Sequence, residues 1–219
     1  MEGTSGGEAV KVAYVTLSTF VGYSNGSGPK RASFVRQTRR LYERPARGGF
    51  DFYRRPTNAI RAGRAAGMDE EAMTALVEQA PPAARGHFAA VADGWLHYLG
   101  RPEFARGRVP EVVECGRARW RHSDFELGVS PHLGLRKRDG RTYATWLYCK
   151  VEPLTPDVAN LACWTMNEVM DDLIPGAEAM VVDVRRATPY VLGARGRARV
   201  GRWALSEVSS FLTLWDNAA

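Results

Sequence analysis

The sequence predicts one α/β (α+β) domain with a mixed central sheet of about four to five strands flanked by helices. An N-terminal strand and a helical extension are expected to precede it. The length of 219 residues is typical of one domain with elaborations, and a hydrophobic content of 45% allows a sizeable core. Residues 141–151 carry apolar side chains on both faces, which is typical of a strand at the centre of a sheet.

The first part of the chain, residues 1–83, is expected to hold the N-terminal strand and a basic helical section. Residues 10–21 are rich in β-branched and aromatic residues, which indicates a strand. A basic helix is expected over residues 30–42. Pro56 suits the first turn of a further helix, and Asp69 suits the N-cap of the next one.

The second part, residues 84–219, is expected to form the α/β core. Its elements follow in the order helix, three strands, helix, strand and helix, with Asp139-Gly140 as a strong hairpin turn. Ser206 is expected to cap the last helix. The other expected elements are a helix at residues 85–99, strand segments around 118–120, 125–129 and 133–135, the strand at 141–151, a helix at 155–170, and strands at 180–184 and 189–192.

Positive charge is concentrated in one segment of the chain. The formal net charge is +6, but residues 30–64 contain eleven basic residues against Glu43 and Asp51, a local net charge of +9. Clustered arginine is the electrostatic pattern expected of a protein that contacts a phosphate backbone. The candidate phosphate contacts are Arg36, Arg39, Arg40, Arg54, Arg55, Arg61 and Arg64.

Two other interpretations of this segment stay open. Only four of the 30 basic residues are lysine, a bias that a GC-rich bacterial genome also produces, and a solvated basic face without a ligand would have the same pattern. If the ligand is nucleic acid, Phe52, Tyr53 and Trp120 are the candidates for stacking on bases.

Two short motifs lie at the ends of expected core strands. Pro131-His132 precedes one strand, and Tyr148-Cys149-Lys150 ends the central one. Together with the order hairpin, central strand, crossover helix and strand, they resemble the PD-(D/E)XK nuclease superfamily. Pro131 and Lys150 match that motif, whereas His132 and Tyr148 stand where it has acidic residues.

The resemblance implies a site for Mg²⁺, held by carboxylates, with a lysine that stabilises developing charge. A neutral imidazole and a phenol are poor Mg²⁺ ligands, so the resemblance implies a degenerate, non-catalytic copy. Lys150 would lie on the remnant active-site face. The acids that could replace the missing ones are Asp183, Glu126, Asp124 and Glu152, with Lys150, Asp183 and Glu126 as the candidate catalytic set.

The sequence does not indicate a membrane protein, a secreted protein, or a dinucleotide-binding or P-loop protein. The chain has no apolar run near the roughly 18 residues of a membrane helix, and its polar, acidic first residues differ from a signal peptide. It has no dinucleotide-binding fingerprint, and the glycine-rich loop at residues 24–31 lacks the P-loop spacing. Three cysteines without CxxC spacing favour a reducing cytoplasm.

Three functions remain in view. The first is a non-catalytic, nuclease-like protein that contacts nucleic acid. The second is an active metal-dependent nuclease that uses displaced acids. The third is a basic module that binds an acidic protein. The sequence leaves the oligomeric state open.

Overall fold

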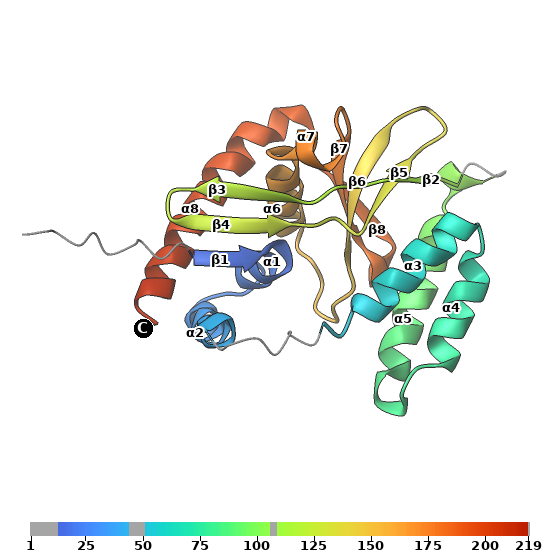
Figure 1. Cartoon of the computed structure of the whole chain (residues 1–219), viewed down its shortest axis with the longest axis horizontal. Helices are drawn as coiled ribbons and strands as arrows, with labels where there is room; N and C mark the ends of the chain where they lie inside the picture. Colours follow the sequence, from blue (N-terminus) through green and yellow to red (C-terminus); the bar gives the residue numbers. More distant parts are fainter. Residues whose placement is uncertain (1–12, 44–50, 106–108, 219) are drawn as a thin grey trace, which may run out of the picture.

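The computed structural model describes residues 13–43, 51–105 and 109–218. The strands of the described residues form a five-stranded mixed sheet in the order β2-β5-β6-β7-β8 and a three-stranded sheet in the order β1-β4-β3 (Figure 1). This confirms the predicted α/β fold. The strands are β1 (Ala13–Thr16), β2 (Glu111–Val113), β3 (Ala118–His122), β4 (Phe125–Val129), β5 (Leu133–Arg136), β6 (Thr142–Tyr148), β7 (Glu178–Asp183) and β8 (Thr188–Val191).

Strand β6 is the centre of the larger sheet, as its sequence predicts. It pairs antiparallel with β5, through the hairpin turn that contains Gly140, and parallel with β7. Helix α6 makes the crossover between the two parallel strands. Residues 143–148 are all buried, because helices or the second sheet cover both faces.

Helices divide into two groups, one on each side of the larger sheet. In Figure 1, α3–α5 lie to the right of β6, and the smaller sheet with α1 and α2 lies to its left. No helix in the described ranges is both long and apolar enough to cross a membrane. The helices are α1 (Leu17–Ser24), α2 (Pro29–Glu43), α3 (Arg54–Ala66), α4 (Asp69–Glu78), α5 (Pro82–Leu99), η1 (Pro102–Phe104), α6 (Pro156–Asn167), α7 (Met170–Leu173), η2 (Val184–Arg186) and α8 (Ala194–Asp216).

The smaller sheet joins the N-terminal strand to the second part of the chain. Strand β1 pairs parallel with β4, with Ala13 opposite Phe125, and β3 pairs antiparallel with β4. The sequence analysis expected these strand segments but not a second sheet. The pairing places the start of the described chain beside residues more than 100 positions later.

Two expected boundaries are wrong. The strand expected over residues 10–21 ends at Thr16, whose hydroxyl accepts a hydrogen bond from the Thr19 backbone N–H (3.3 Å) and caps α1; residues 10–12 lie outside the described ranges. The last helix begins at Ala194, not at Ser206, whose hydroxyl donates to the Arg202 carbonyl within the helix.

Asp69 does not cap α4 through its side chain. It accepts a hydrogen bond from the Trp95 indole (3.1 Å) and forms an ion pair with Arg64 (2.9 Å). The carboxylate therefore ties α3 to α5 across the first turn of α4.

Gly94 on α5 allows the helix to approach the backbone that follows β7. A Cβ atom at Gly94 would overlap the Val184 carbonyl, with its carbon at 2.8 Å, whereas a Cβ atom at Gly86 on the same helix would meet no atom within 4 Å. We predict that Gly94→Ala lowers the free energy of unfolding by about 1–3 kcal/mol through overpacking. Gly86→Ala should raise it by up to about 1 kcal/mol, because alanine favours the helix. Urea unfolding of both variants tests this packing, and equal effects would contradict it.

Candidate functional site

A groove of 1090 Å³ lies between the smaller sheet and helix α3. One wall is formed by β1, the start of α1 and β3, the other by α3, and the floor by residues around the start of β5 and by Trp146 of β6. Most of its lining side chains are polar. They include the hydroxyl and amide groups of Thr16, Ser18, Thr57, Asn58 and Ser130.

Four arginines line the groove from two opposite walls: Arg54, Arg61, Arg117 and Arg119. The first two belong to α3, where they share one helical face with Thr57 and Asn58, because the spacing is i, i+3, i+4 and i+7. The other two lie just before and within β3. Asp51 and Asp172 are the acidic residues among the described lining, so the groove is positive on balance.

Three of these arginines have exposed, unpaired side chains. Arg54, Arg61 and Arg117 form no hydrogen bond or ion pair with any residue in the described ranges. Arg119 differs, because it forms an ion pair with Glu126 and lies over the ring of Tyr14, with its guanidinium carbon 5.4 Å from the ring centroid. The groove therefore presents cationic groups whose charge no described side chain neutralises.

The groove continues into a small recess of 70 Å³. Ser18, Asp51, Thr57 and His132 line both the groove and the recess, and Lys150 lies at the inner end. The recess brings together the two motif residues that the sequence analysis compared, since His132 directly precedes β5 and Lys150 follows β6. Asp51, which the sequence analysis counted only as a charge, lies beside both of them.

His132 is held as a neutral hydrogen-bond donor. Its Nδ1 accepts a hydrogen bond from the Leu147 backbone N–H (2.9 Å), and its ring stacks on Trp146 with a centroid separation of 6.2 Å. An accepting Nδ1 carries no proton, so Nε2 carries the proton of the neutral ring. Burial lowers the pKa of His132 to about 4, against a smaller opposing effect of Asp51.

Lys150 projects toward the first two helices. Its ammonium group lies 3.2 Å from where a Cβ atom of Gly22 on α1 would be, beside the ring of Phe34 on α2. Burial lowers the pKa of Lys150, while Glu152 and Asp51 oppose that effect. Within the described ranges, Lys150 forms no hydrogen bond or ion pair, so its ammonium group is a partly desolvated cation with open donor positions.

The recess does not fit the Mg²⁺ that the resemblance implies. Magnesium needs several oxygen ligands, and Asp51 is the one carboxylate among the described residues of the recess. The Nε2 of His132 carries a proton and cannot donate a lone pair. Across the described ranges, no three His, Cys, Asp or Glu side chains are grouped as a metal site would require. We therefore derive no chemical step through a metal.

The two displaced acids of the candidate catalytic set do not line the recess. Asp183 is fully buried at the end of β7, where it accepts hydrogen bonds from Arg186 (3.1 Å) and from the Leu154 backbone N–H (3.2 Å). Glu126 lies on β4 between Arg119 and Arg121. Both carboxylates are paired within the fold, and the structure brings neither beside Lys150.

The seven candidate phosphate contacts separate into three groups. Arg54 and Arg61 line the groove, while Arg36 and Arg40 are exposed on α2 outside it. The others hold parts of the fold together: Arg39 donates to the Trp215 carbonyl, Arg55 to the Gln79 carbonyl, and Arg64 pairs with Asp69.

Arg117 and Arg119 are not found from the sequence, because only the pairing of β4 with both β3 and β1 brings them opposite α3. The sequence analysis also expected Trp120 to be available for stacking. Trp120 is only 8% exposed and packs edge-on against Trp164. Of the other two expected residues, Tyr53 lines the recess and Phe52 packs on Tyr53 and Phe88.

The glycine-rich loop after α1 is fixed by hydrogen bonds to other parts of the fold. Arg31 fills it by donating to the carbonyls of Gly26 (2.9 Å) and Ser24 (3.0 Å) and by pairing with Glu207. Asn25 bonds the backbone of Pro153 and Thr155. These contacts engage the Arg31 guanidinium and the Asn25 side chain within the fold.

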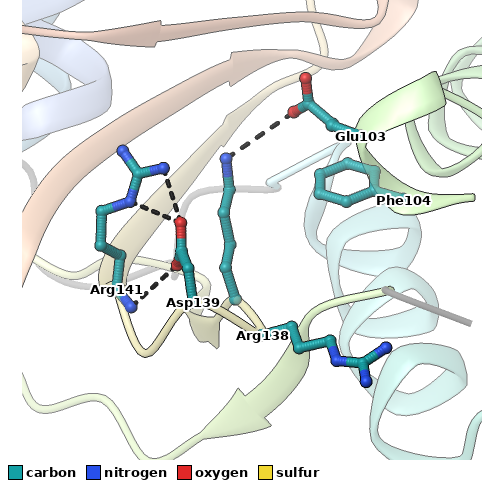
Figure 2. Close-up of a pocket in the computed structure, with 6 residues that line it drawn as sticks. Glu103, Phe104, Arg138, Asp139 and Arg141 are labelled. Atoms are coloured by element: carbon teal, nitrogen blue, oxygen red, sulfur yellow. Dashed lines mark hydrogen bonds and ion pairs between the residues drawn. The ribbon is translucent and has the colours of Figure 1, made fainter.

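A second pocket, of 560 Å³, lies at the tip of the β5–β6 hairpin (Figure 2). Arg141 pairs with Asp139 (2.6 Å) and Lys137 with Glu103 (3.7 Å), so its charges largely neutralise one another. The turn joins the end of β5 to the start of β6, opposite the end where His132 and Lys150 lie. We therefore place the candidate site in the groove.

Comparisons of the chain with protein-family models, with curated proteins and with solved structures find no match.

The half-buried, neutral His132 makes stability depend on pH. The unfolded state binds a proton near pH 6.5 and the folded state only near pH 4, so stability is complete above about 6.5 and falls between these values. We predict a loss of up to about 3 kcal/mol in the free energy of unfolding over this range. In His132→Asn, whose amide oxygen can accept the Leu147 N–H, this loss should disappear. A loss of the same size in both proteins would contradict the assignment.

Proposed function

We propose that this protein binds nucleic acid through the groove between α3 and the smaller sheet, without cleaving it. The observation that carries the proposal is the placement of three exposed arginines, Arg54, Arg61 and Arg117, on opposite walls of one groove, with no partner among the described residues. A phosphate backbone is the polyanion that such a line of cations recognises, and the polar groups between them suit phosphate and sugar oxygens.

The recess supports the non-catalytic part of the proposal. His132 and Lys150 both line it and both carry hydrogen-bond donors, which stabilise a phosphate oxygen. Metal-assisted activation of water needs several oxygen ligands for the metal, and Asp51 is the one carboxylate among the described residues of the recess. The order of β5, β6, α6 and β7 also supports a relationship to the nuclease-like architecture, with its acids replaced.

The proposal places the protein in the cytoplasm. Nucleic acid is available there, and the thiols of Cys115, Cys149 and Cys163, all free, would stay reduced.

The proposal predicts that charge in the groove matters more than charge elsewhere. The triple variant Arg54→Gln, Arg61→Gln and Arg117→Gln should bind a labelled oligonucleotide more weakly. The slope of log K against log salt is negative, and for a single strand its magnitude should fall by about 2, because about 0.7 counterions are released per phosphate contact. Fluorescence anisotropy across a salt series measures both quantities.

The matched control is the triple variant Arg36→Gln, Arg40→Gln and Arg195→Gln. It removes the same charge from exposed positions outside the groove. Its salt slope should stay close to that of the unaltered protein. Equal effects of the two triple variants would refute the groove as the contact. Salt-sensitive capture of an acidic protein, without affinity for DNA or RNA, would replace the proposal with a protein-binding function.

A further inference from the structure

An exposed group of aromatic rings lies at one end of the groove. Tyr14 of β1 lines the groove and is 38% exposed, and Tyr42, near the end of α2, is 40% exposed. Their ring centroids are 6.2 Å apart, and Tyr42 lies 6.5 Å from Trp215 of α8. Large aromatic side chains usually lose their exposure on folding, so this exposed pair needs an explanation.

The fold fixes both tyrosines in place. Tyr14 lies across Gly128 of β4, where a Cβ atom would be 2.5 Å from the tyrosine hydroxyl, so glycine lets the ring lie against the strand. The Tyr42 hydroxyl accepts a hydrogen bond from the Thr16 backbone N–H (3.3 Å) and lies 3.4 Å from the Thr19 hydroxyl. The rings are therefore positioned before any ligand arrives.

Arginine is interleaved with these rings. The Arg119 guanidinium lies over Tyr14, and that of Arg39 lies over Trp215 at 5.9 Å. A cationic groove that ends in exposed aromatic rings is the arrangement by which proteins hold unpaired strands, with phosphates along the cations and bases on the rings. In a duplex, the flat faces of the bases are stacked on one another and cannot reach such rings.

Building on the proposed function, we infer that the ligand of the groove is single-stranded nucleic acid, with an unpaired base stacked at Tyr14 and Tyr42. These residues replace the stacking candidates of the sequence analysis. The rings contact the base, whereas Arg54, Arg61 and Arg117 contact the phosphates. The two interactions can therefore be removed independently.

The test compares four labelled ligands of about 12 units, a length within the site sizes of single-strand binders. They are oligo-dT, oligo-U, an abasic strand with the same phosphates, and a DNA duplex. For the unaltered protein, we expect one of the intact strands to bind about five- to a hundredfold more tightly than the abasic strand. The duplex should bind more weakly than that intact strand. The ranking of oligo-dT and oligo-U distinguishes DNA from RNA as the source of the strand.

The variant Tyr14→Leu with Tyr42→Leu should lose the preference for intact over abasic strands but keep its affinity for the abasic one. The double phenylalanine variant, which keeps both rings, should keep the preference. Because the abasic comparison uses the unaltered protein, it decides whether bases contribute to binding even where the leucine variant is unstable. The two tyrosine variants decide whether Tyr14 and Tyr42 are the rings that hold the base.

Equal binding of intact and abasic strands, or tighter binding of the duplex, would overturn the inference and leave the proposed function standing. An absence of binding to all four ligands at low salt would overturn both.

Discussion

The burial of β6 on both faces is the constraint on which the rest of the structure depends. Ala144, Trp146 and Tyr148 face one hydrophobic core, with α1, α6, α8 and the smaller sheet, while Tyr143 and Leu147 face the other, with α3–α5. A strand with two apolar faces has to be covered twice. The two covering layers stand apart over the end of β6, and the groove lies between them.

This arrangement also explains the character of the recess. The end of β6 passes from full burial at Cys149 to partial burial at Lys150, so the recess has little water to solvate charge. His132 responds by staying neutral, with its Nδ1 bonded to the backbone of β6. Lys150 has no such partner in the described ranges, and an anionic ligand would supply a hydrogen-bond acceptor and a negative charge for its ammonium group. Under the proposed function, these two positions would contact a phosphate.

Much of the fold follows from local patterns. The apolar faces of residues 141–151 and the Asp139-Gly140 turn are signals within one element, and the structure has β6 and its hairpin there. The pattern of residues 10–21 does not distinguish a strand from a helix, because a short apolar run is compatible with both a strand and a buried helix. Here Thr16 decides the boundary by capping α1.

The site is less accessible to prediction, because it is built by tertiary pairing. The polar face of α3 can be found from the spacing of Arg54, Thr57, Asn58 and Arg61 alone. No local signal places Arg117 opposite that face, or Tyr14 beside Tyr42. The first depends on how β3 pairs with β4, and the second on how α2 lies against β1. Charge counting could not separate free arginines from those, such as Arg64, that the fold neutralises.

The most direct measurement of the central claim is photo-cross-linking of a bound strand that contains 4-thiouridine or 4-thiothymidine, with the cross-linked peptides mapped by mass spectrometry. The account predicts cross-links to β1, β3 and α3, the walls of the groove. Cross-links confined to Arg36 and Arg40 of α2 or to the start of α8 would contradict it, because these residues line neither the groove nor the aromatic pair of Tyr14 and Tyr42.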